Sequence, residues 1–220
     1  MYGLLYVLLA WLATAKASAI IPGPNPFLVF GVAMQAQVPA GKQRLSREDW
    51  LDFGLTVLRE EGPQALKAEP LCKRLGVSRG SFYWHFDSAG AFMLAVVERW
   101  EARATEQVIL AVQQCAGGAA EKLRFLLRKV GELDVRLYEA IHSLEARLPE
   151  LTGVLRRVHE RRLGFLAELL VALGFAADEA ALRARMTYAW AMGELLTRDP
   201  RQQAYTEAQI AAVERLLLRP

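Results

Sequence analysis

Apolar residues recur at helical spacing along almost the whole chain after Leu45, and no strand pattern of useful length interrupts them. Ser46 precedes the first apolar stripe and Asp49 follows three residues later, which is the arrangement of a helix N-cap with a capping box. Gly62 and Pro63 then end this predicted helix. The residues of the stripe are Trp50, Leu51, Gly54, Leu55 and Leu58.

Two short helices with a tight turn between them come next. The first is predicted over about residues 68–75 and the second over about 79–85. Gly76 can adopt a positive φ in the turn, and Ser78 is a residue type that favours the cap of the second helix. The inward-facing side of the first short helix consists of Leu71, Cys72 and Leu75.

Longer amphipathic patterns fill the rest of the chain. Glycine and proline residues separate them, at Gly117, Gly118, Pro149, Gly174 and Pro200. Together these patterns predict an all-α protein. Its longer helices are expected near residues 89–115, 119–131, 134–147, 150–173, 178–197 and 206–218.

The stretch VSRGSFYWHF, residues 77–86, has two distinct faces when it is placed on a short helix. Val77, Phe82 and Phe86 share one face, and we expect them in a core. The opposite face carries side chains that hydrogen bond or stack, and we expect it to point outward. Its residues are Arg79, Gly80, Ser81, Tyr83, Trp84 and His85.

A short helix, a glycine turn and a second short helix form a helix-turn-helix, whose second helix can lie in the major groove of DNA. Arg79 suits a guanine edge or a phosphate, and Gly80 lets the backbone approach closely. Trp84 can pack on a sugar or on a thymine methyl group. The remaining candidates, which offer hydrogen bonds or charge to phosphate oxygens, are Lys67, Ser81, Tyr83 and His85.

Residues 45–100 resemble the tetracycline-repressor (TetR) family of bacterial transcription regulators. The resemblance rests on LGVSRGSFYWHF, together with the preceding helix SREDWLDFGLTVLREEG and the apolar helix that follows. It implies an N-terminal three-helix helix-turn-helix DNA-binding domain over residues 42–107, with the motif itself at 67–86. It also implies a C-terminal helical domain for dimerisation and ligand binding over residues 108–220, which resembles the family only in being helical.

The resemblance also implies a function. We expect a ligand-responsive regulator, in the first place a repressor, that binds a palindromic operator in double-stranded DNA as a homodimer. Two recognition helices would lie in successive major grooves about 34 Å apart, and a ligand would release DNA by favouring a different spacing. Apolar segments such as LGFLAELLVALGF suggest a small apolar ligand. An activator is the alternative within this class.

One face of the predicted helix 178–197 suits the contact between two subunits. Small residues on this face allow two helices to approach closely, and the predicted helix 206–218 adds further apolar residues. Two such helices from each subunit would form a four-helix interface. The residues of the two faces are Leu182, Met186, Ala189, Gly193 and Leu196, and Ile210, Val213, Leu216 and Leu217.

Two positions depart from the family pattern. Ala89 stands where the family usually carries a lysine that contacts phosphate, and Ala68 and Glu69 stand where the family often offers Thr or Arg. The charges between Lys42 and Gln107 balance to about zero. Fewer phosphate contacts than usual, and a shallower salt dependence, are therefore expected. The cations left for DNA are Lys42, Arg44, Lys67, Lys73 and Arg79.

Composition narrows the classes of function. The 220 residues are 53% hydrophobic and 23% charged, which is enough for a core in one or two domains. The net charge of +3 does not by itself decide for nucleic acid. Cys72 and Cys115 lack ligand spacing and are expected as free thiols in a reducing cytoplasm. No HExxH, GxSxG or P-loop motif occurs, so we expect no enzyme, cofactor or metal site.

Two features of the C-terminal half allow a functional and a structural interpretation. His142 and His159 could line a ligand pocket, although lone histidines are more often satisfied structural residues. The segment RRVHERR, residues 156–162, looks like a DNA-binding patch. A solvated helix face with an Arg156–Glu160 pair is the simpler interpretation.

Residues 1–41 form an apolar leader. Its opening MYGLLYVLLAWLATA is an uncharged, largely apolar run of 15 residues, whereas a membrane span needs about 20, and no basic residue precedes the run as in a signal peptide. A membrane or export segment, a disordered leader and translation from Met34 are the three alternatives, and the last is favoured. A cytoplasmic protein with no membrane partner is therefore expected, and the rival is a membrane-associated helical module held by residues 1–34.

Overall fold

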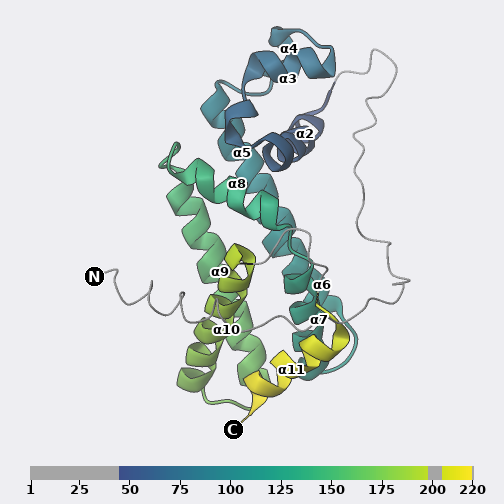
Figure 1. Ribbon diagram of the computed structural model, residues 1–220, viewed down its shortest axis with the longest axis vertical. Helices are drawn as coiled ribbons and strands as arrows, with labels where there is room; N and C mark the ends of the chain where they lie inside the picture. The colour runs from purple at the N-terminus through teal and green to yellow at the C-terminus, as the bar shows by residue number, and fades with distance from the viewer. Residues whose placement is uncertain (1–44, 198–204, 220) are drawn as a thin grey trace, which may run out of the picture. The chain divides into compact units, whose positions relative to one another are not determined.

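The computed structural model describes residues 45–197 and 205–219, and all regular elements in these ranges are helical (Figure 1). The apolar leader and the expected phosphate contacts Lys42 and Arg44 lie outside the described residues. The longer elements are α2 (Arg47–Glu61), α5 (Ala89–Glu101), α6 (Gln107–Gln114), α7 (Ala119–Gly131), α8 (Val135–Glu145), α9 (Leu151–Ala172), α10 (Ala177–Thr197) and α11 (Glu207–Leu218). The short elements are η1 (Pro63–Ala65), α3 (Ala68–Leu75), α4 (Arg79–Tyr83) and the π-helical turn η2 (Ala102–Glu106).

Helix α2 begins and ends as its sequence predicts. The hydroxyl of Ser46 accepts a hydrogen bond from the Asp49 amide at 3.1 Å, and the Asp49 carboxylate accepts one from the Ser46 amide at 2.8 Å. These two bonds complete the capping box. Gly62 ends the helix with a φ of 80°, a conformation that favours glycine. The predicted stripe is buried along its whole length, from Trp50 to Leu58.

The helix predicted over 89–115 is interrupted in the structure by the π-helical turn η2 between α5 and α6. The side chain of Arg162 reaches this turn from α9. Its Nε donates to the hydroxyl of Thr105 at 2.9 Å, and its Nη2 donates to the carbonyl of Ala104 at 3.2 Å. A side chain that bonds to backbone carbonyls is one cause of such interruptions. The apolar spacing of the segment gives no sign of this contact.

One apolar core joins α2, α3, α4 and α5 to the start of the C-terminal half. It contains Trp50, Phe82 and Phe92, together with Ile141 of α8 and Leu155 of α9. Helices α2 and α5 approach closely at Gly54. A Cβ atom there would lie 2.6 Å from Val96 Cγ2 and 2.7 Å from Phe92 Cζ. The missing side chain of Gly54 is therefore what permits this approach.

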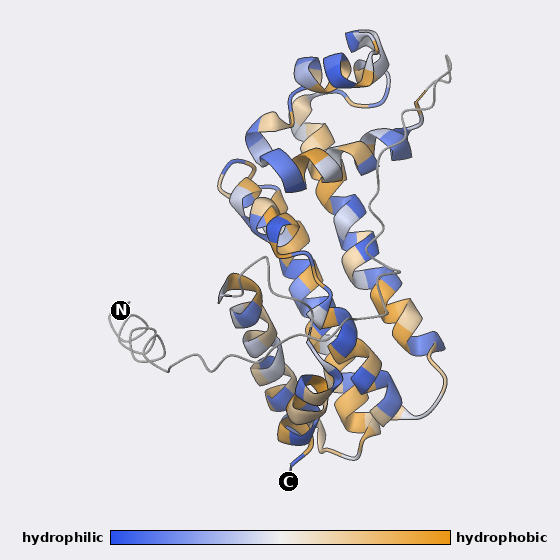
Figure 2. Ribbon diagram, turned by 45° about the vertical axis from the view of Figure 1, so that its right-hand side comes forward, coloured by the Kyte–Doolittle hydropathy of each residue, from blue (hydrophilic) through white to orange (hydrophobic). Residues whose placement is uncertain are grey.

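Two smaller apolar clusters hold α6, α7, α9, α10 and α11 together. Leu123, Leu170 and Ala184 lie in one of them, and Ile109 and Phe165 lie in the other. Helix α9 packs along α10 (Figure 1). The helices carry interleaved hydrophobic and hydrophilic residues, as expected of amphipathic helices (Figure 2). None of the helices in residues 45–197 and 205–219 combines the length and apolar character of a membrane span.

The ion pairs of the segment 156–162 differ from the predicted one. Arg157 pairs with Glu101 at 3.5 Å and Arg161 pairs with Glu106 at 3.4 Å. The predicted Arg156–Glu160 pair is not among the ion pairs of the described chain. The arginines at 157 and 161 therefore form ion pairs with the neighbouring helix α5–η2–α6, and not within α9.

Candidate nucleic-acid interface and internal cavity

Helices α3 and α4 are joined by the predicted tight turn. Gly76 follows α3 with a φ of 65°, in the left-handed region that favours glycine. The amide of Val77 donates to the carbonyl of Cys72 at 3.0 Å, which closes the turn. Ser78 is the N-cap residue of α4, but its hydroxyl forms no capping hydrogen bond. The first predicted short helix has the predicted bounds, whereas the second is two residues shorter than predicted.

Helix α4 has only five residues, and a cluster of aromatic rings holds it in place. Phe82 is fully buried. Its ring centroid lies 5.4 Å from those of Trp50 and Phe86 and 5.3 Å from that of Phe92. The contacts with Trp50 and Phe92 are edge-to-face, and such contacts stabilise a core beyond the area they bury. Phe82 thus fixes α4 to both α2 and α5, and Val77 packs against the same core.

The outward face of α4 carries the side chains that the sequence predicts there. Tyr83 is 47% exposed and Trp84 is 70% exposed. Arg79 and Gly80 are exposed as well, while Ser81 is half-buried. The guanidinium of Arg79 lies 5.9 Å from the centroid of the Tyr83 ring. Its hydrogen bond to Tyr83 raises the pKa of Arg79, so this side chain presents a permanent positive charge beside an aromatic ring.

His85 differs from its neighbours on this face. It is half-buried, and its Nε2 lies 3.0 Å from the carbonyl oxygen of Leu45. A carbonyl only accepts hydrogen bonds, so Nε2 carries the proton in this contact. The contact ties the start of α2 to the end of the helix-turn-helix.

The basic residues of the helix-turn-helix divide into paired and unpaired ones. Arg74 pairs with Glu61, while Arg99 and Arg103 both bind Asp52, at 3.0 Å and 2.6 Å. Although burial alone would raise the pKa of Asp52, these two hydrogen-bonded arginines lower it. The exposed cations of the motif with no ion pair in the described part of the chain are Lys67, Lys73 and Arg79.

Ala89 is the first residue of α5, directly after the N-cap Ser88. The hydroxyl of Ser88 accepts a hydrogen bond from the Ala91 amide at 3.0 Å. Ala89 itself is half-buried, and Glu69 in the first turn of α3 is exposed. Both departures from the family pattern therefore lie at helix N-termini of the helix-turn-helix region, and neither supplies a positive charge.

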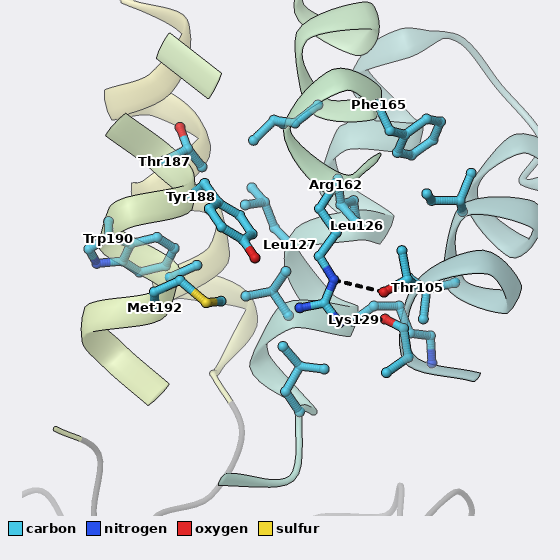
Figure 3. Close-up of a pocket in the computed structure, with 17 residues that line it drawn as sticks. Thr105, Leu126, Leu127, Lys129, Arg162, Phe165, Thr187, Tyr188, Trp190 and Met192 are labelled. Carbon is cyan, nitrogen blue, oxygen red and sulfur yellow. Dashed lines mark hydrogen bonds between the residues drawn. The ribbon is translucent and has the colours of Figure 1, made fainter. Parts of the chain in front are cut away.

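A cavity of about 70 Å³ lies between η2, α7, α9 and α10 (Figure 3). Most of its lining is apolar, with Val108, Leu126, Phe165 and Trp190 among the larger side chains. Its polar lining residues are Thr105, Lys129, Arg162, Thr187 and Tyr188.

A chain of polar side chains runs outward from this cavity. Burial raises the pKa of Tyr188, although the nearby Arg162 guanidinium acts to lower it. The hydroxyl of Tyr188 lies 2.6 Å from Nδ1 of His159, and the His159 ring stacks on that of His142 with centroids 6.2 Å apart. Burial lowers the pKa of both histidines. Nε2 of His142 is buried without a hydrogen-bond partner in the described residues.

The two histidines considered from the sequence thus lie beside the cavity lining rather than in it. Arg162 and Tyr188, which do line the cavity, were not singled out from the sequence. Arg162 belongs to the segment that was interpreted as a solvated face. Its burial follows from the packing of η2 and α10 against α9, which the sequence pattern does not reveal.

Helix α10 exposes an apolar face beside α11. Leu182 is 51% exposed, and Met186 and Leu196 are each 65% exposed. A shallow groove between the two helices includes Leu182 and Met186 of α10 and Leu216 of α11. Leu216 is 69% exposed, whereas Ile210 is buried within the chain. A Cβ atom added at Gly193 on this face would meet no atom within 4 Å, so this residue leaves room for a neighbouring helix.

Comparison with known proteins gives a family for the helix-turn-helix region. Residues 51–96 match the family described as bacterial regulatory proteins, tetR family. This range contains α3, α4, most of α2 and the first part of α5. Among curated protein sequences, none matches the chain.

Solved structures of regulators share the fold. Escherichia coli NemR in its reduced form has a TM-score of 0.68 at 18% identity, over 79% of this chain and 97% of that chain. The fatty acid degradation regulator FadR from Bacillus halodurans has a TM-score of 0.60 at 19% identity, over 81% and 97%. A TetR/AcrR-family regulator from Thermobifida fusca has a TM-score of 0.58 at 18% identity, over 79% and 96%.

Proposed function

We propose that this chain, a TetR-family regulator with an N-terminal helix-turn-helix and a C-terminal helical region, represses transcription from a palindromic DNA operator and responds to a small ligand. The proposal rests above all on the outward face of α4. Arg79, Tyr83 and Trp84 are exposed on a five-residue helix that Phe82 anchors from the opposite side. Exposed aromatic and cationic side chains on a fixed helix are suited to read a major groove.

The proposed contacts divide into those that read bases and those that bind phosphates. Arg79 would reach a guanine edge, and Gly80 would let the backbone of α4 approach the groove. Trp84 would pack on a sugar or a thymine methyl group. Lys67, Ser81 and Tyr83 would bind phosphate oxygens. His85 would position the motif through the bond of its Nε2 to Leu45, and it stays a proposed phosphate contact through Nδ1.

Few phosphate contacts are available to this interface. Lys67, Lys73 and Arg79 are the motif cations that remain unpaired in the described chain, and Ala89 supplies none. Each phosphate that is neutralised adds about 0.9 to the slope of log K against log salt concentration. The proposed complex therefore has a shallow salt dependence, and a larger share of its affinity comes from contacts to the bases.

The proposed regulator binds DNA as a homodimer, so the residues from about 108 onward serve as a dimerisation and ligand domain. The exposed face of α10 and the neighbouring Leu216 would contact their symmetry mates in the second copy. An isologous contact places the same patch on both subunits, and it would match a palindromic operator. Exposed leucine and methionine side chains would gain free energy when water leaves them.

Ligand response is proposed through the internal cavity. The cavity is lined by η2, which continues directly from α5, and α5 packs on α4 through Phe92. A ligand that binds one arrangement of these helices better than the other would shift the equilibrium between them. Release of DNA requires only this difference in affinity.

The test is selection of binding sites from random DNA duplexes by the purified full chain. The proposal predicts enrichment of one palindrome with half-sites about one helical turn, or a multiple of it, apart. Footprinting upstream of the gene for this protein would then show the same sequence. Folded protein that enriches no common sequence would overturn the proposal.

A further inference from the structure

We propose that the cavity binds a short aliphatic carboxylate, that Arg162 is the residue that holds it, and that this ligand acts by taking Arg162 away from η2. The inference deepens the proposed function and rests on it for its regulatory part. Two cations line this mainly apolar cavity, Lys129 and Arg162 (Figure 3). Lys129 is already paired with Glu132, at 2.7 Å.

Arg162 has no carboxylate partner in the described chain. The two acids that flank η2 are bound by other residues of α9, Glu101 by Arg157 and Glu106 by Arg161. Arg162 instead donates to two neutral oxygens, those of Thr105 and Ala104. Its guanidinium also lies 5.2 Å from the centroid of the Trp100 ring. A half-buried guanidinium bound only to neutral groups would gain from an anion, because charge-assisted hydrogen bonds are about twice as strong as neutral ones.

The geometry of the donors favours a carboxylate. A guanidinium has five N–H groups in a planar fork that matches the two oxygens of a carboxylate. Nε and Nη2 make the two bonds to Thr105 and Ala104, which leaves further N–H groups on the fork. The hydroxyl of Thr105, which accepts a hydrogen bond from Arg162 and keeps its own proton, lies in the same lining and can donate to a carboxylate oxygen. In Figure 3, the guanidinium and the Tyr188 hydroxyl both point into the middle of the lining side chains.

The size and lining of the cavity define the rest of the ligand. A water molecule needs roughly 10–15 Å³ of cavity volume measured with a water-sized sphere. The volume of about 70 Å³ therefore accepts about five to seven non-hydrogen atoms. A carboxylate accounts for three of them, which leaves a tail of about two to four carbons against Val108, Leu126 and Phe165. Butyrate is a suitable probe, and butyramide is its neutral counterpart of the same size.

The contacts of Arg162 connect this site to the DNA-binding face. Its present partners, Ala104 and Thr105, belong to η2, which continues from α5. A carboxylate bound to the remaining N–H groups would draw the guanidinium toward the cavity and away from these two residues, and the loss of their bonds would loosen the turn. Helix α5 carries Phe92, whose ring contacts Phe82 of α4. Binding would thus favour a state in which α5 and the recognition helix have moved together.

Tryptophan fluorescence and calorimetry of the full chain test the binding step. Trp100 lies under Arg162, and Trp190 lines the cavity, so both report on it. We expect saturable binding of butyrate with a Kd of roughly 1 mM or tighter, an order that so small a ligand can reach. Butyramide and inorganic phosphate should bind at least about tenfold more weakly, since each lacks either the charge or the shape that the site complements.

Two variants and a control decide whether Arg162 is responsible. Arg162→Gln should weaken butyrate binding at least about tenfold, because it removes the charge-assisted bonds. Arg157→Gln removes the same charge from an exposed position on the same helix and should leave binding unchanged. Ala191→Leu places a larger side chain in the cavity, leaves Arg162 unsubstituted and should also block binding. This variant tests the site even if Arg162→Gln does not fold.

Several results would overturn the inference. They are the absence of saturable butyrate binding to the folded wild type, equal binding to Arg162→Gln, and equal binding of butyramide or phosphate. The regulatory part is tested with operator DNA obtained by site selection. Butyrate should weaken DNA binding by the wild type and should not affect DNA binding by Arg162→Gln. If the chain binds DNA but not butyrate, this inference fails and the proposed function stands. If it binds no DNA, the proposed function fails and the binding measurement still decides the carboxylate site.

Discussion

The ring of Phe92 in α5 packs edge-on against the ring of Phe82 in α4, with centroids 5.3 Å apart and planes inclined by 65°. Phe82 is buried on the inner side of the helix whose outer side carries Arg79 and Tyr83. A movement of α5 along its axis would therefore be transmitted to the proposed DNA-binding face. The same Phe92 ring covers Gly54 of α2, so three helices meet at one residue.

Substitution at Gly54 tests how closely these helices are packed. Gly54→Ala would place a Cβ 2.6 Å from Val96 and 2.7 Å from Phe92, in a core without free space. We expect a loss of about 1–3 kcal/mol in the free energy of unfolding, as for other overpacked cores. The matched control is Gly164→Ala in α9, which is exposed and meets no atom within 4 Å. There the better helix propensity of alanine should stabilise the fold by up to about 1 kcal/mol. Chemical denaturation measures the free energy of unfolding of both variants. Equal changes in Gly54→Ala and Gly164→Ala would contradict the close packing at Gly54.

A lysine at residue 89, where the family pattern usually has one, tests whether the start of α5 faces DNA. Ala89→Lys should add one phosphate contact per subunit, so log K should fall more steeply with log salt, by about 0.9 for each subunit. The preferred sequence should not change, because phosphates carry no base identity. Ala172→Lys adds the same charge at an exposed position at the end of α9 and should leave the slope as it is. An unaltered slope in Ala89→Lys would mean that residue 89 does not face DNA.

The proposed dimer predicts a strong effect at Gly193. Gly193→Glu would bury an unpaired charge between the α10 helices of two subunits and should raise the dimer dissociation constant at least about 100-fold. Gly164→Glu introduces the same side chain at an exposed position of α9, outside the proposed α10 face, and should leave the dimer intact. Light scattering at micromolar protein concentration distinguishes the two. A monomeric wild type, or a dimeric Gly193→Glu variant, would refute this interface.

The half-buried pair of His142 and His159 predicts how the free energy of unfolding depends on pH. Burial lowers the pKa of His142, against the opposing effect of Glu145, and burial, His142 and Arg162 lower that of His159. As the pH falls below the ordinary histidine value of about 6.5, the unfolded chain takes up protons before the folded chain does. The free energy of unfolding should therefore be highest above about pH 6.5 and should decrease toward about pH 5.5. His159→Gln keeps an acceptor for Tyr188 and should show a smaller decrease. A free energy of unfolding that rises toward acid pH would contradict this assignment.

Much of the fold follows from local signals in the sequence. The Ser46–Asp49 capping box, the positive φ of Gly76 and the stops at Gly62 and Gly174 all depend on a few neighbouring residues. The bounds of α3 and α7 are confirmed for the same reason, since each helix has a clear apolar stripe and a clear end.

The structural features that could not be predicted from the sequence involve contacts between residues far apart in the chain. The π-helical turn η2 is hydrogen-bonded by Arg162, which lies more than fifty residues further along the chain. The ion pairs of Arg157 and Arg161 likewise cross from α9 to the helix that contains η2. In the candidate interface, the two faces of α4 were predictable from helical spacing, whereas the bond between His85 and Leu45 depends on how α2 folds back.

Substitution of Tyr83 decides whether the outward face of α4 binds DNA, on which the proposed function depends. Tyr83 is 47% exposed and lies outside the apolar core, so Tyr83→Ala should leave the fold intact. The measurement is the DNA affinity of wild type and variant by mobility shift on the selected operator, with thermal unfolding of the same samples. We expect the free energy of unfolding of the variant to lie within about 0.5 kcal/mol of the wild-type value. Its affinity for DNA should be weaker by about tenfold or more. A folded Tyr83→Ala protein that binds the operator with wild-type affinity would show that this face does not bind DNA.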